Sequence, residues 1–276
     1  MQGVTRRLAV WGDPISHSMS PVLHRAAYAR LGLDWTYERR QVAEAGFADA
    51  LAGLDASWLG LSVTMPLKGA AHRAARTLDP HAALTGAVNT LLLDEAGPRG
   101  YNTDVGGIVD ALADADIRML DTVRLLGAGA TAASTLVAAA ELGATRADVR
   151  ARRPERAEPL VALGERLGVA VTARGFAAPA EPVDMTLSSL PGGAALDADV
   201  VTELAASGGA LFDAAYAPWP SAFAAVWPSS TVVSGLGMLL HQAVRQVRIF
   251  AHGDPFAALD DEQALVSDMR AALAAA

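Results

Sequence analysis

A glycine loop between a predicted strand and a predicted helix constrains the fold of this chain more than any other feature. The apolar run 122–126 leads directly into Gly127-Ala128-Gly129-Ala130-Thr131-Ala132, and a helix-forming stretch then reaches Leu142. In such a G-x-G-x-x-A loop the first glycine permits a tight turn, the second lets the backbone approach a pyrophosphate, and the small last residue lets the helix pack closely. Because another strand follows near 147–151, the segment has the size of one βαβ unit. We predict that this loop binds a dinucleotide; the alternative is a plain turn of small residues.

The rest of the chain extends this unit into an α/β protein of two domains. At 276 residues the chain is long enough for about two domains. The first half alternates short apolar runs with helical patterns and lacks a glycine fingerprint, and we place the domain boundary near Asp104. In the first half we predict strands at 7–12, 35–42, 58–64 and 88–93, a short strand ending at Asn102, and helices at 20–33, at 45–54 and after Lys68. In the second half we predict further parallel strands at 183–188, 210–213 and 231–233, and two C-terminal helices at 236–252 and 256–275.

Composition excludes several classes of function. With 52% hydrophobic residues the chain is not a disordered protein, and a net charge of −8 argues against nucleic acid or an anionic membrane as a general partner. The absence of cysteine excludes disulfides and thiolate catalysis, and the six histidines lack HxxxH or HExxH spacing, so we expect no metal site. No apolar run approaches the roughly 18–20 residues of a membrane span, and the N-terminus does not read as a signal peptide. We therefore expect a cytoplasmic protein.

Arginines after the strand near 147–151 indicate which dinucleotide the loop binds. The segment Arg150-Ala-Arg152-Arg153-Pro-Glu-Arg156 follows this strand, and the acid within the strand, Asp148, precedes the strand's expected end. An NAD site usually offers a carboxylate to the ribose at this position, whereas arginines suit a 2′-phosphate. We therefore predict NADP(H) rather than NAD; a solvated, basic helix start is the alternative reading.

A second group of polar residues follows the strands of the first half. The chain has 21 arginines but one lysine, Lys68, and two asparagines, Asn89 and Asn102. Lys68, Asn89 and Asp104 each have a plain reading, as a surface lysine, a turn residue or a helix cap. Because strand ends on one side of a sheet converge, they would line one pocket together. The loop from Gly12 to Pro21 adds the hydroxyls of Ser16 and Ser18, which either bind a polar ligand or only cap a helix.

These motifs, in this order, resemble the shikimate dehydrogenase family, within the shikimate/quinate 5-dehydrogenase superfamily, from about Trp11 to Gln242. The matching segments are Gly12 to His24 (G-x-P-I-x-H-S-x-S-P-x-x-H), Ser62-Val-Thr64-Met-Pro66-Leu-Lys68, Gly86-Ala-Val-Asn89-Thr, Asn102-Thr-Asp104, Asp213-x-x-Tyr216-x-Pro218 and Gly235-x-x-Met238-Leu-x-x-Gln242. Ser62, Ala151 and Thr186 each stand where the family often has asparagine.

The resemblance implies an enzyme that reversibly reduces 3-dehydroshikimate to shikimate with NADPH, a step of the chorismate pathway. It implies a substrate domain of residues 1–104 plus 240–276 and a Rossmann-like NADP-binding domain of residues 105–239, acting as a monomer or homodimer. Lys68 and Asp104 would be catalytic. The substrate would be bound by Ser16, Ser18, Thr64, Asn89, Tyr216 and Gln242. The cofactor would be bound by Gly127, Ala128, Gly129, Ala130, Thr131, Arg152, Arg153, Arg156, Ser188, Gly235 and Met238.

Two alternatives to this function stay open at the level of sequence. A quinate or quinate/shikimate dehydrogenase shares almost every motif. An NADP-binding regulatory protein of the same fold would need only the glycine loop, so the presence of both Lys68 and Asp104 speaks against it.

Overall fold

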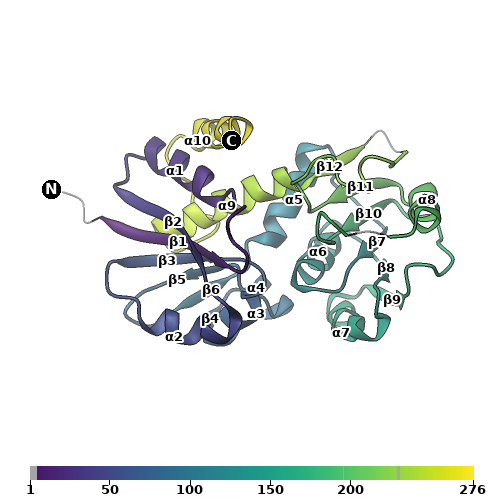
Figure 1. Ribbon diagram of the computed structural model, residues 1–276, viewed down its shortest axis with the longest axis horizontal. Helices are drawn as coiled ribbons and strands as arrows, with labels where there is room; N and C mark the ends of the chain where they lie inside the picture. Colours follow the sequence, from purple (N-terminus) through teal and green to yellow (C-terminus); the bar gives the residue numbers. More distant parts are fainter. Residues whose placement is uncertain (1–4, 195, 229–230) are drawn as a thin grey trace. The chain divides into compact units, whose positions relative to one another are not determined.

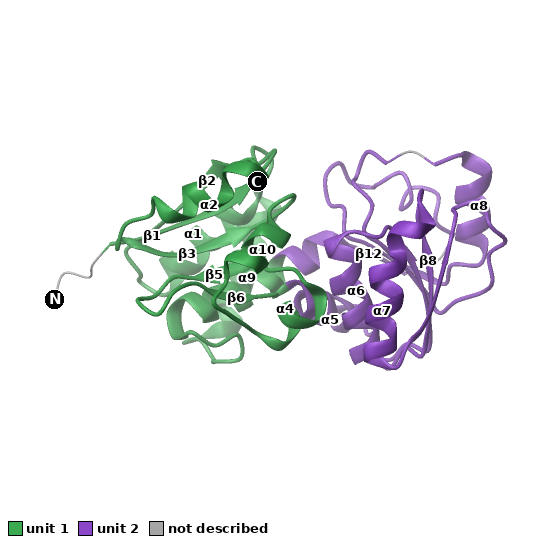
Figure 2. Cartoon of the chain, turned by 90° about the horizontal axis from the view of Figure 1, so that it is seen from below, with its two compact units in different colours: residues 1–103, 240–276 green, residues 104–239 purple. Residues whose placement is uncertain are grey.

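The computed structural model describes residues 5–194, 196–228 and 231–276 (Figure 1). The chain divides into two compact units, one ending at Thr103 and completed by Leu240–Ala276, the other spanning Asp104–Leu239 (Figure 2). Among the described residues each unit contains its own six-stranded sheet. The C-terminal helices therefore return to the first unit, and the protein is an α/β protein, as predicted.

The sheet of the first unit has the order β2-β1-β3-β5-β6-β4. Its strands are β1 (Arg6–Gly12), β2 (Trp35–Gln41), β3 (Trp58–Val63), β4 (Thr77–Leu78), β5 (Thr90–Leu92) and β6 (Arg99–Tyr101). β5 runs antiparallel to both neighbours, with Ser62 opposite Thr90 and Thr90 opposite Tyr101. The start of β5 therefore lies at the same sheet edge as the ends of β3 and β6.

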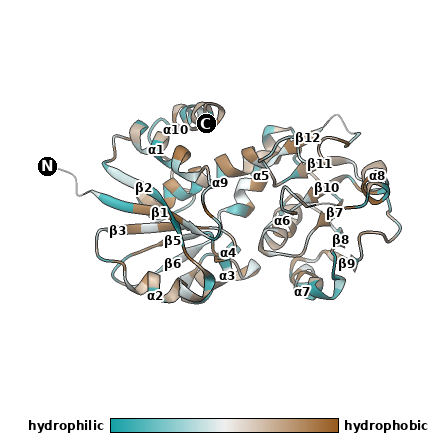
Figure 3. Ribbon diagram, viewed as in Figure 1, coloured by the Kyte–Doolittle hydropathy of each residue, from teal (hydrophilic) through white to brown (hydrophobic). Residues whose placement is uncertain are grey.

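Short helices and an apolar core support this sheet. The helices are α1 (Ser20–Arg30), a 3-10 turn η1 (Glu44–Gly46), α2 (Phe47–Ala52), α3 (Lys68–Ala74), α4 (Pro80–Thr85), the later part of α9 (Gly235–His252) and α10 (Glu262–Ala274). Trp11, Phe47 and Leu61 are at most 2% exposed in the core below β1 and β3. Figure 3 shows the contrast between the hydrophilic start of β1 and the more hydrophobic β3.

The second unit contains a parallel sheet in the order β12-β11-β10-β7-β8-β9. Its strands are β7 (Thr122–Leu126), β8 (Arg146–Arg150), β9 (Ala170–Arg174), β10 (Met185–Ser188), β11 (Ala210–Asp213) and β12 (Val232–Ser234). Its helices are α5 (Asp104–Asp114), α6 (Ala130–Glu141), a 3-10 turn η2 (Pro154–Ala157), α7 (Glu158–Leu167), α8 (Ala198–Ala206) and the start of α9. Numbered from β7, this is the 3-2-1-4-5-6 order of a doubly wound dinucleotide-binding domain, whose switch point lies between β7 and β10.

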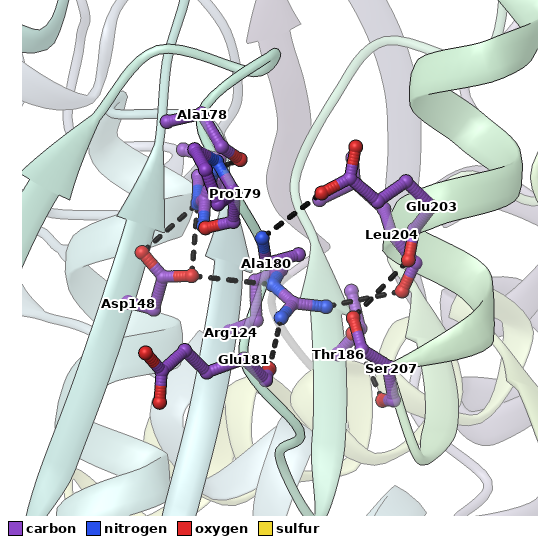
Figure 4. Close-up of polar contacts among 12 residues, drawn as sticks. Arg124, Asp148, Ala178, Pro179, Ala180, Glu181, Thr186, Glu203, Leu204 and Ser207 are labelled. Atoms are coloured by element: carbon purple, nitrogen blue, oxygen red, sulfur yellow. Dashed lines mark hydrogen bonds and ion pairs between the residues drawn. The ribbon is translucent and has the colours of Figure 1, made fainter.

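A segment without helix, residues 175–183, connects the edge strand β9 to β10 and must pass β8 and β7 to do so. We call this segment the strap. Two fully buried arginines, Arg124 and Arg150, hold it, and Figure 4 shows the contacts of Arg124. Arg124 donates to the carbonyl oxygens of Glu181 (2.5 Å) and Leu204 (3.0 Å), and Arg150 donates to three strap carbonyls, including that of Pro179 (2.8 Å). The guanidinium groups satisfy backbone oxygens that a crossover helix would satisfy by itself.

One carboxylate lies between these two guanidinium groups. Asp148 on β8 accepts from the Nε of Arg124 at 3.3 Å and from the Nε of Arg150 at 2.8 Å. Burial lowers the pKa of Arg124, while the hydrogen bond that it donates to Asp148 acts in the opposite direction. The cluster therefore carries two positive charges and one negative charge below the strap.

Some predicted elements differ from the structure. The helix α1 begins at Ser20, as predicted, but ends at Arg30 rather than residue 33, and Ser18 Oγ accepts from the Ser20 backbone N–H. The last helix begins at Glu262 instead of residue 256. The sequence analysis also missed α4, α7, α8, β4 and β9. No helix in the described ranges is long and apolar enough to cross a membrane.

Candidate functional site

Two loops meet at the edge of the first sheet where β1 and β3 end. The Asp13 N–H donates to the Met65 carbonyl at 3.0 Å, and the Thr64 N–H donates to the Trp11 carbonyl at 2.9 Å. Gly12 permits this approach, because a Cβ atom there would lie 2.5 Å from Cγ2 of Thr64. The loop after β1, which carries Ser16 and Ser18, is therefore held beside Thr64.

The hydroxyl-bearing residues of this edge are accessible. Ser16 is exposed, and Ser18 and Thr64 are half-buried. Arg39 Nε donates to the Ser18 carbonyl at 2.8 Å, which fixes the backbone of the loop without using the Ser18 hydroxyl. Hydrogen bonds thus hold the backbone that carries Ser18 and Thr64 in place, as a binding site for a polar ligand requires.

Lys68 lies at the same edge, at the start of α3, and its side chain is half-buried. Its carbonyl accepts from the Val88 N–H at 3.1 Å, which ties the first turn of α3 to the segment before Asn89. Asn89 precedes β5, so the expectation that it ends a strand is wrong. Because β5 is antiparallel, Asn89 still lies at the edge where β3 ends, and its carbonyl accepts from the Val63 N–H at 2.7 Å.

Asn89 is 3% exposed, and its carboxamide is held by Thr103. Asn89 Oδ1 accepts from the Thr103 N–H, and Asn89 Nδ2 donates to Thr103 Oγ1, each at 2.9 Å. Asp104, 4% exposed, follows directly in the chain as the first residue of α5 and is grouped with the second unit. Thr103 thus connects a predicted binding residue to a predicted catalytic residue.

Gln242 and Gln246 lie one turn apart on the same face of α9. Gln242 is 7% exposed and Gln246 is 2% exposed. Gln246 Nε2 donates to the Asn89 carbonyl at 3.3 Å. The sequence analysis missed both Gln246 and Thr103; the spacing of two glutamines four residues apart on an apolar helix was the signal available for Gln246.

The glycine loop of the second unit has the geometry of a phosphate cradle. Gly127 has φ +110°, a left-handed conformation, and a Cβ there would lie 2.5 Å from Ser189 Oγ. Apart from its neighbours in the chain, no atom of the described residues lies within 4 Å of the position that a Cβ would take at Gly129, so space is open in front of the start of α6. Ala132 is 1% exposed, which lets α6 pack closely on the sheet. The helix N-terminus therefore offers backbone N–H groups and the positive end of its dipole to an anion.

A cleft of about 290 Å³ adjoins this loop. It is lined by Gly127, Ala128, Ala151, Arg152, Arg153, Arg156, Phe176, Leu190, Ala194 and Leu196. Arg152, Arg153 and Arg156 are exposed, and none of them forms an ion pair with another described residue. Three guanidinium groups beside a helix N-terminus fit the charge and donor chemistry of an adenosine phosphate carrying a 2′-phosphate.

Arg150 does not belong to this cationic group, although the sequence analysis counted it there. Its side chain points into the unit and is fully buried by Asp148 and the strap. The end of β8 explains the difference, because Arg150 is its last residue and Arg152, Arg153 and Arg156 lie past the strand, where the sheet no longer directs their side chains.

The remaining predicted residues follow strands of the second sheet. Ser188 ends β10, and its buried Oγ has no hydrogen-bond partner among the described residues. Tyr216, half-buried, follows β11. At Gly235 a Cβ would lie 2.1 Å from the Ala214 carbonyl, so glycine is needed there, and Met238 is 9% exposed on α9. All four lie near carboxyl ends of strands, where doubly wound sheets bind their ligands.

Comparisons with known proteins agree with this geometry. The family model described as "Shikimate dehydrogenase substrate binding domain" matches residues 10–91. A shikimate dehydrogenase (NADP(+)) of Methanothermobacter thermautotrophicus is 34% identical over 264 residues, covering 92% of this chain and 93% of that protein.

Solved structures extend the similarity to the whole fold. The crystal structure of Mycobacterium tuberculosis shikimate dehydrogenase is 39% identical with a TM-score of 0.84, covering 98% of this chain and 100% of that one. The Thermus thermophilus shikimate 5-dehydrogenase in complex with NADP(H) and shikimate is 28% identical with a TM-score of 0.79, covering 97% and 100%. This chain belongs to the shikimate dehydrogenase family.

Proposed function

We propose that the protein catalyses the reversible, NADPH-dependent reduction of 3-dehydroshikimate to shikimate. The observation that carries this proposal is the edge of the first sheet, which gathers Ser18, Thr64, Lys68 and Asn89 in one unit. The cationic cleft beside the glycine loop of the other unit supports it. In this proposal residues 1–104 with 240–276 form the substrate domain, and residues 105–239 form the NADP-binding domain.

Hydroxyl and amide groups bind the substrate in this proposal. Ser16, Ser18 and Thr64 donate hydrogen bonds to its carboxylate, because their loops are held together where β1 and β3 end. The ring hydroxyls of the substrate are bound by Asn89, Tyr216 and Gln242. This division suits a small ligand with one charge and several hydroxyls.

The glycine loop and the three exposed arginines would hold the cofactor. Gly127, Gly129 and the start of α6 bind the pyrophosphate through backbone N–H groups, while Arg152, Arg153 and Arg156 bind the 2′-phosphate. Ala128, Ala130, Thr131, Ser188, Gly235 and Met238 are assigned to the same cofactor site. When bound, the nicotinamide supplies or accepts the hydride.

Lys68 and Asp104 handle the proton at the reacting carbon. Reduction of a ketone creates an alkoxide-like oxygen, and a nearby ammonium group stabilises and protonates it. Asp104 orients this ammonium group and accepts a hydrogen bond from the substrate hydroxyl. Arginine holds its proton too tightly to exchange it readily, which explains a lysine in a chain that otherwise uses arginine.

A matrix of four assays tests the activity. Purified protein is given shikimate or quinate, each with NADP+ or NAD+, and reduction of the cofactor is followed by absorbance. We expect the highest kcat/KM with shikimate and NADP+. A higher value with quinate would assign the protein to the quinate dehydrogenases, and no turnover with any pair would favour an NADP-binding regulator.

Substitution of Lys68 tests its role. We expect Lys68→Ala to lower kcat by roughly 10²–10⁴-fold with a much smaller change in shikimate affinity. Lys68→Arg keeps the charge but should also be poor. The double variant with Asp104→Ala should lose far less than the product of the two single losses, because groups that act together are non-additive. If Lys68→Arg turned over near the wild-type rate, Lys68 would act only through its positive charge and would not transfer the proton.

Location and assembly belong to the same proposal. We propose a cytoplasmic protein that acts as a monomer or homodimer. Fractionation of the source cells tests the first statement, and light scattering of the purified protein tests the second.

A further inference from the structure

A buried network of hydrogen bonds lies beneath Asn89, and Gln246 is its centre. Gln246 Nε2 lies 3.0 Å from Thr90 Oγ1 and 3.3 Å from the Asn89 carbonyl oxygen. Its Oε1 lies 2.7 Å from Ser62 Oγ and 3.0 Å from His24 Nε2. Thr90 Oγ1 lies 2.8 Å from Asn89 Oδ1. These five side chains are at most 3% exposed, so the protein itself satisfies the network.

Two backbone groups determine the direction of every hydrogen bond between Gln246 and Asn89. The Thr103 N–H can only donate, so the Asn89 atom that it meets must be Oδ1. The Asn89 carbonyl can only accept, so the Gln246 atom that it meets must be Nε2. Since Nε2 also faces Thr90, it donates to Oγ1, and Thr90 directs its own hydrogen to Asn89 Oδ1.

The same reasoning continues on the other side of Gln246. Its Oε1 must accept, so Ser62 donates to it and in turn accepts from the Tyr37 hydroxyl at 2.6 Å. His24 must present Nε2–H to Oε1, which leaves Nδ1 to accept from the Tyr28 hydroxyl at 3.0 Å. Burial lowers the pKa of His24 to about 3, while the hydrogen bond to Gln246 raises it, so the ring is neutral, as this pattern requires.

From this geometry we propose that Gln246, acting through Thr90, is a positioning residue that holds the Asn89 carboxamide with Oδ1 turned toward the Thr103 backbone. With Oδ1 engaged by Thr103 and Thr90, Asn89 meets a ligand through its Nδ2 group as a donor. This rests on the proposed function, in which Asn89 binds a substrate hydroxyl. A carboxamide free to rotate by 180° would offer donor and acceptor in turn, and substrate binding would weaken.

The rarity of asparagine in this chain makes the orientation directly measurable. Selective 15N labelling of asparagine gives side-chain amide signals from Asn89 and Asn102 alone. Asn102 is an internal reference, because its Nδ2 donates to Thr85 Oγ1 at 2.8 Å, outside the network. The signal that disappears in Asn89→Asp identifies Asn89.

The matched pair Thr90→Val and Thr90→Ser tests the proposal. Valine keeps the shape of threonine but removes the hydroxyl, whereas serine keeps it. We expect Thr90→Val to shift the Asn89 side-chain signal and to leave that of Asn102 in place, with Thr90→Ser close to wild type. Gln246→Glu should shift the Asn89 signal as well, because a carboxylate cannot donate to Thr90. Thermal unfolding of each variant shows that it is folded.

Kinetics of the same variants test the consequence for binding. We expect Thr90→Val to raise the KM for shikimate about three- to tenfold, as the loss of one hydrogen bond would. The KM for NADP+ should hold, because the glycine loop lies in the other unit. Thr90→Ser, which keeps the hydroxyl, should retain the wild-type KM for shikimate.

Two outcomes overturn the proposal. An unmoved Asn89 signal in folded Thr90→Val shows that the network does not hold the carboxamide, and a shifted signal with an unchanged shikimate KM shows that orientation does not govern binding. Failure of the proposed function is seen separately, as wild-type protein that turns over no shikimate while the two amide signals still report on the network.

Discussion

At the scale of the residue, two arginines that lie two positions apart in the chain differ in their exposure to solvent. Arg150 is buried beneath the strap, while Arg152 is exposed beside the glycine loop. The strand β8 ends at Arg150. The side chain of Arg152 therefore lies past the strand, where the sheet no longer determines its direction. The number of arginines in this segment therefore predicts a binding site for an anion, but it does not show which of them belong to the site.

Removing the Arg152 guanidinium tests the 2′-phosphate site. We expect Arg152→Ala to raise the KM for NADP+ at least tenfold, by loss of a charge-assisted hydrogen bond worth about 1.5–3 kcal/mol. The KM for NAD+, which has no 2′-phosphate, should hardly change. Arg118→Ala, which removes another exposed arginine of the same unit, is the control. Equal effects of Arg152→Ala on both cofactors would rule out the phosphate contact.

The loop after β1 carries a second prediction at this scale. Ser18→Ala should weaken shikimate binding by about 1.5–3 kcal/mol, because one hydrogen bond to a carboxylate is lost. The loop backbone should keep its place, since Arg39 holds the Ser18 carbonyl. Titration of shikimate, with NADP+ affinity as the control, measures the effect. A double variant of Ser16 and Ser18 with unchanged shikimate affinity would remove this assignment.

Residues proposed to bind a ligand were easier to find in the sequence than the residues that hold them in place. Lys68 and Asn89 stand out because the chain rarely uses these types, and their position after apolar runs points to a sheet edge. Gln246 and Thr103 act through other side chains, across separations of 157 and 14 residues from Asn89. No local pattern encodes such a contact, because it depends on how β5, β6 and α9 pack.

At the scale of the element, the sequence predicted strands better than their direction. The run 88–93 reads as a strand, but only the pairing of β5 with β3 and β6 shows that it runs antiparallel. The consequence is that Asn89 precedes a strand and still reaches the predicted edge. The strap differs from β5, because a long connection without a helix is unusual in a doubly wound sheet. It depends on the buried arginines, which donate hydrogen bonds to its carbonyl oxygens.

Removal of the carboxylate beneath the strap should destabilise the second unit. Asp148→Asn removes the carboxylate that pairs with both buried guanidinium groups, and breaking a buried ion pair in this way costs about 3–5 kcal/mol. Asp121→Asn is the matched control, since Asp121 pairs with an exposed Arg146 at 3.4 Å and should cost less than about 1 kcal/mol. Chemical denaturation measures both. Equal small losses would show that the carbonyls alone hold the arginines.

At the scale of the whole molecule, the two units with separate sheets match the α/β fold that chain length, the alternating strand and helix patterns and the resemblance predicted. The 3-2-1-4-5-6 order could be anticipated because parallel strands with helical crossovers have few right-handed solutions. The return of the last helices to the first unit followed from the resemblance, since no pattern in residues 240–276 indicates which sheet they pack on.

Protonation of His24 should make the free energy of unfolding depend on pH. In the folded protein burial lowers the pKa of His24 to about 3, against 6.5 when exposed. Between these values the unfolded chain binds the extra proton, so stability falls as pH falls below about 6.5, with a limiting slope of about 1.4 kcal/mol per pH unit.

Denaturation at several pH values measures this dependence. From pH 7.5 to 5 the wild-type protein should lose about 2 kcal/mol through His24. His24→Gln, which keeps a neutral donor beside Gln246, should lose this part of the slope even if it is less stable overall. A variant that retains the full slope would assign the pH dependence to other groups.

The buried arginines also affect how readily a protease cleaves the chain. A stretch of coil such as residues 175–183 is ordinarily a place where cleavage begins, because a protease must draw an extended segment into its own active site. Here the strap cannot lift away without exposing unpaired carbonyls and two dry guanidinium groups at once. We therefore expect a protease to cut this connection more slowly than a coil of the same length without such contacts.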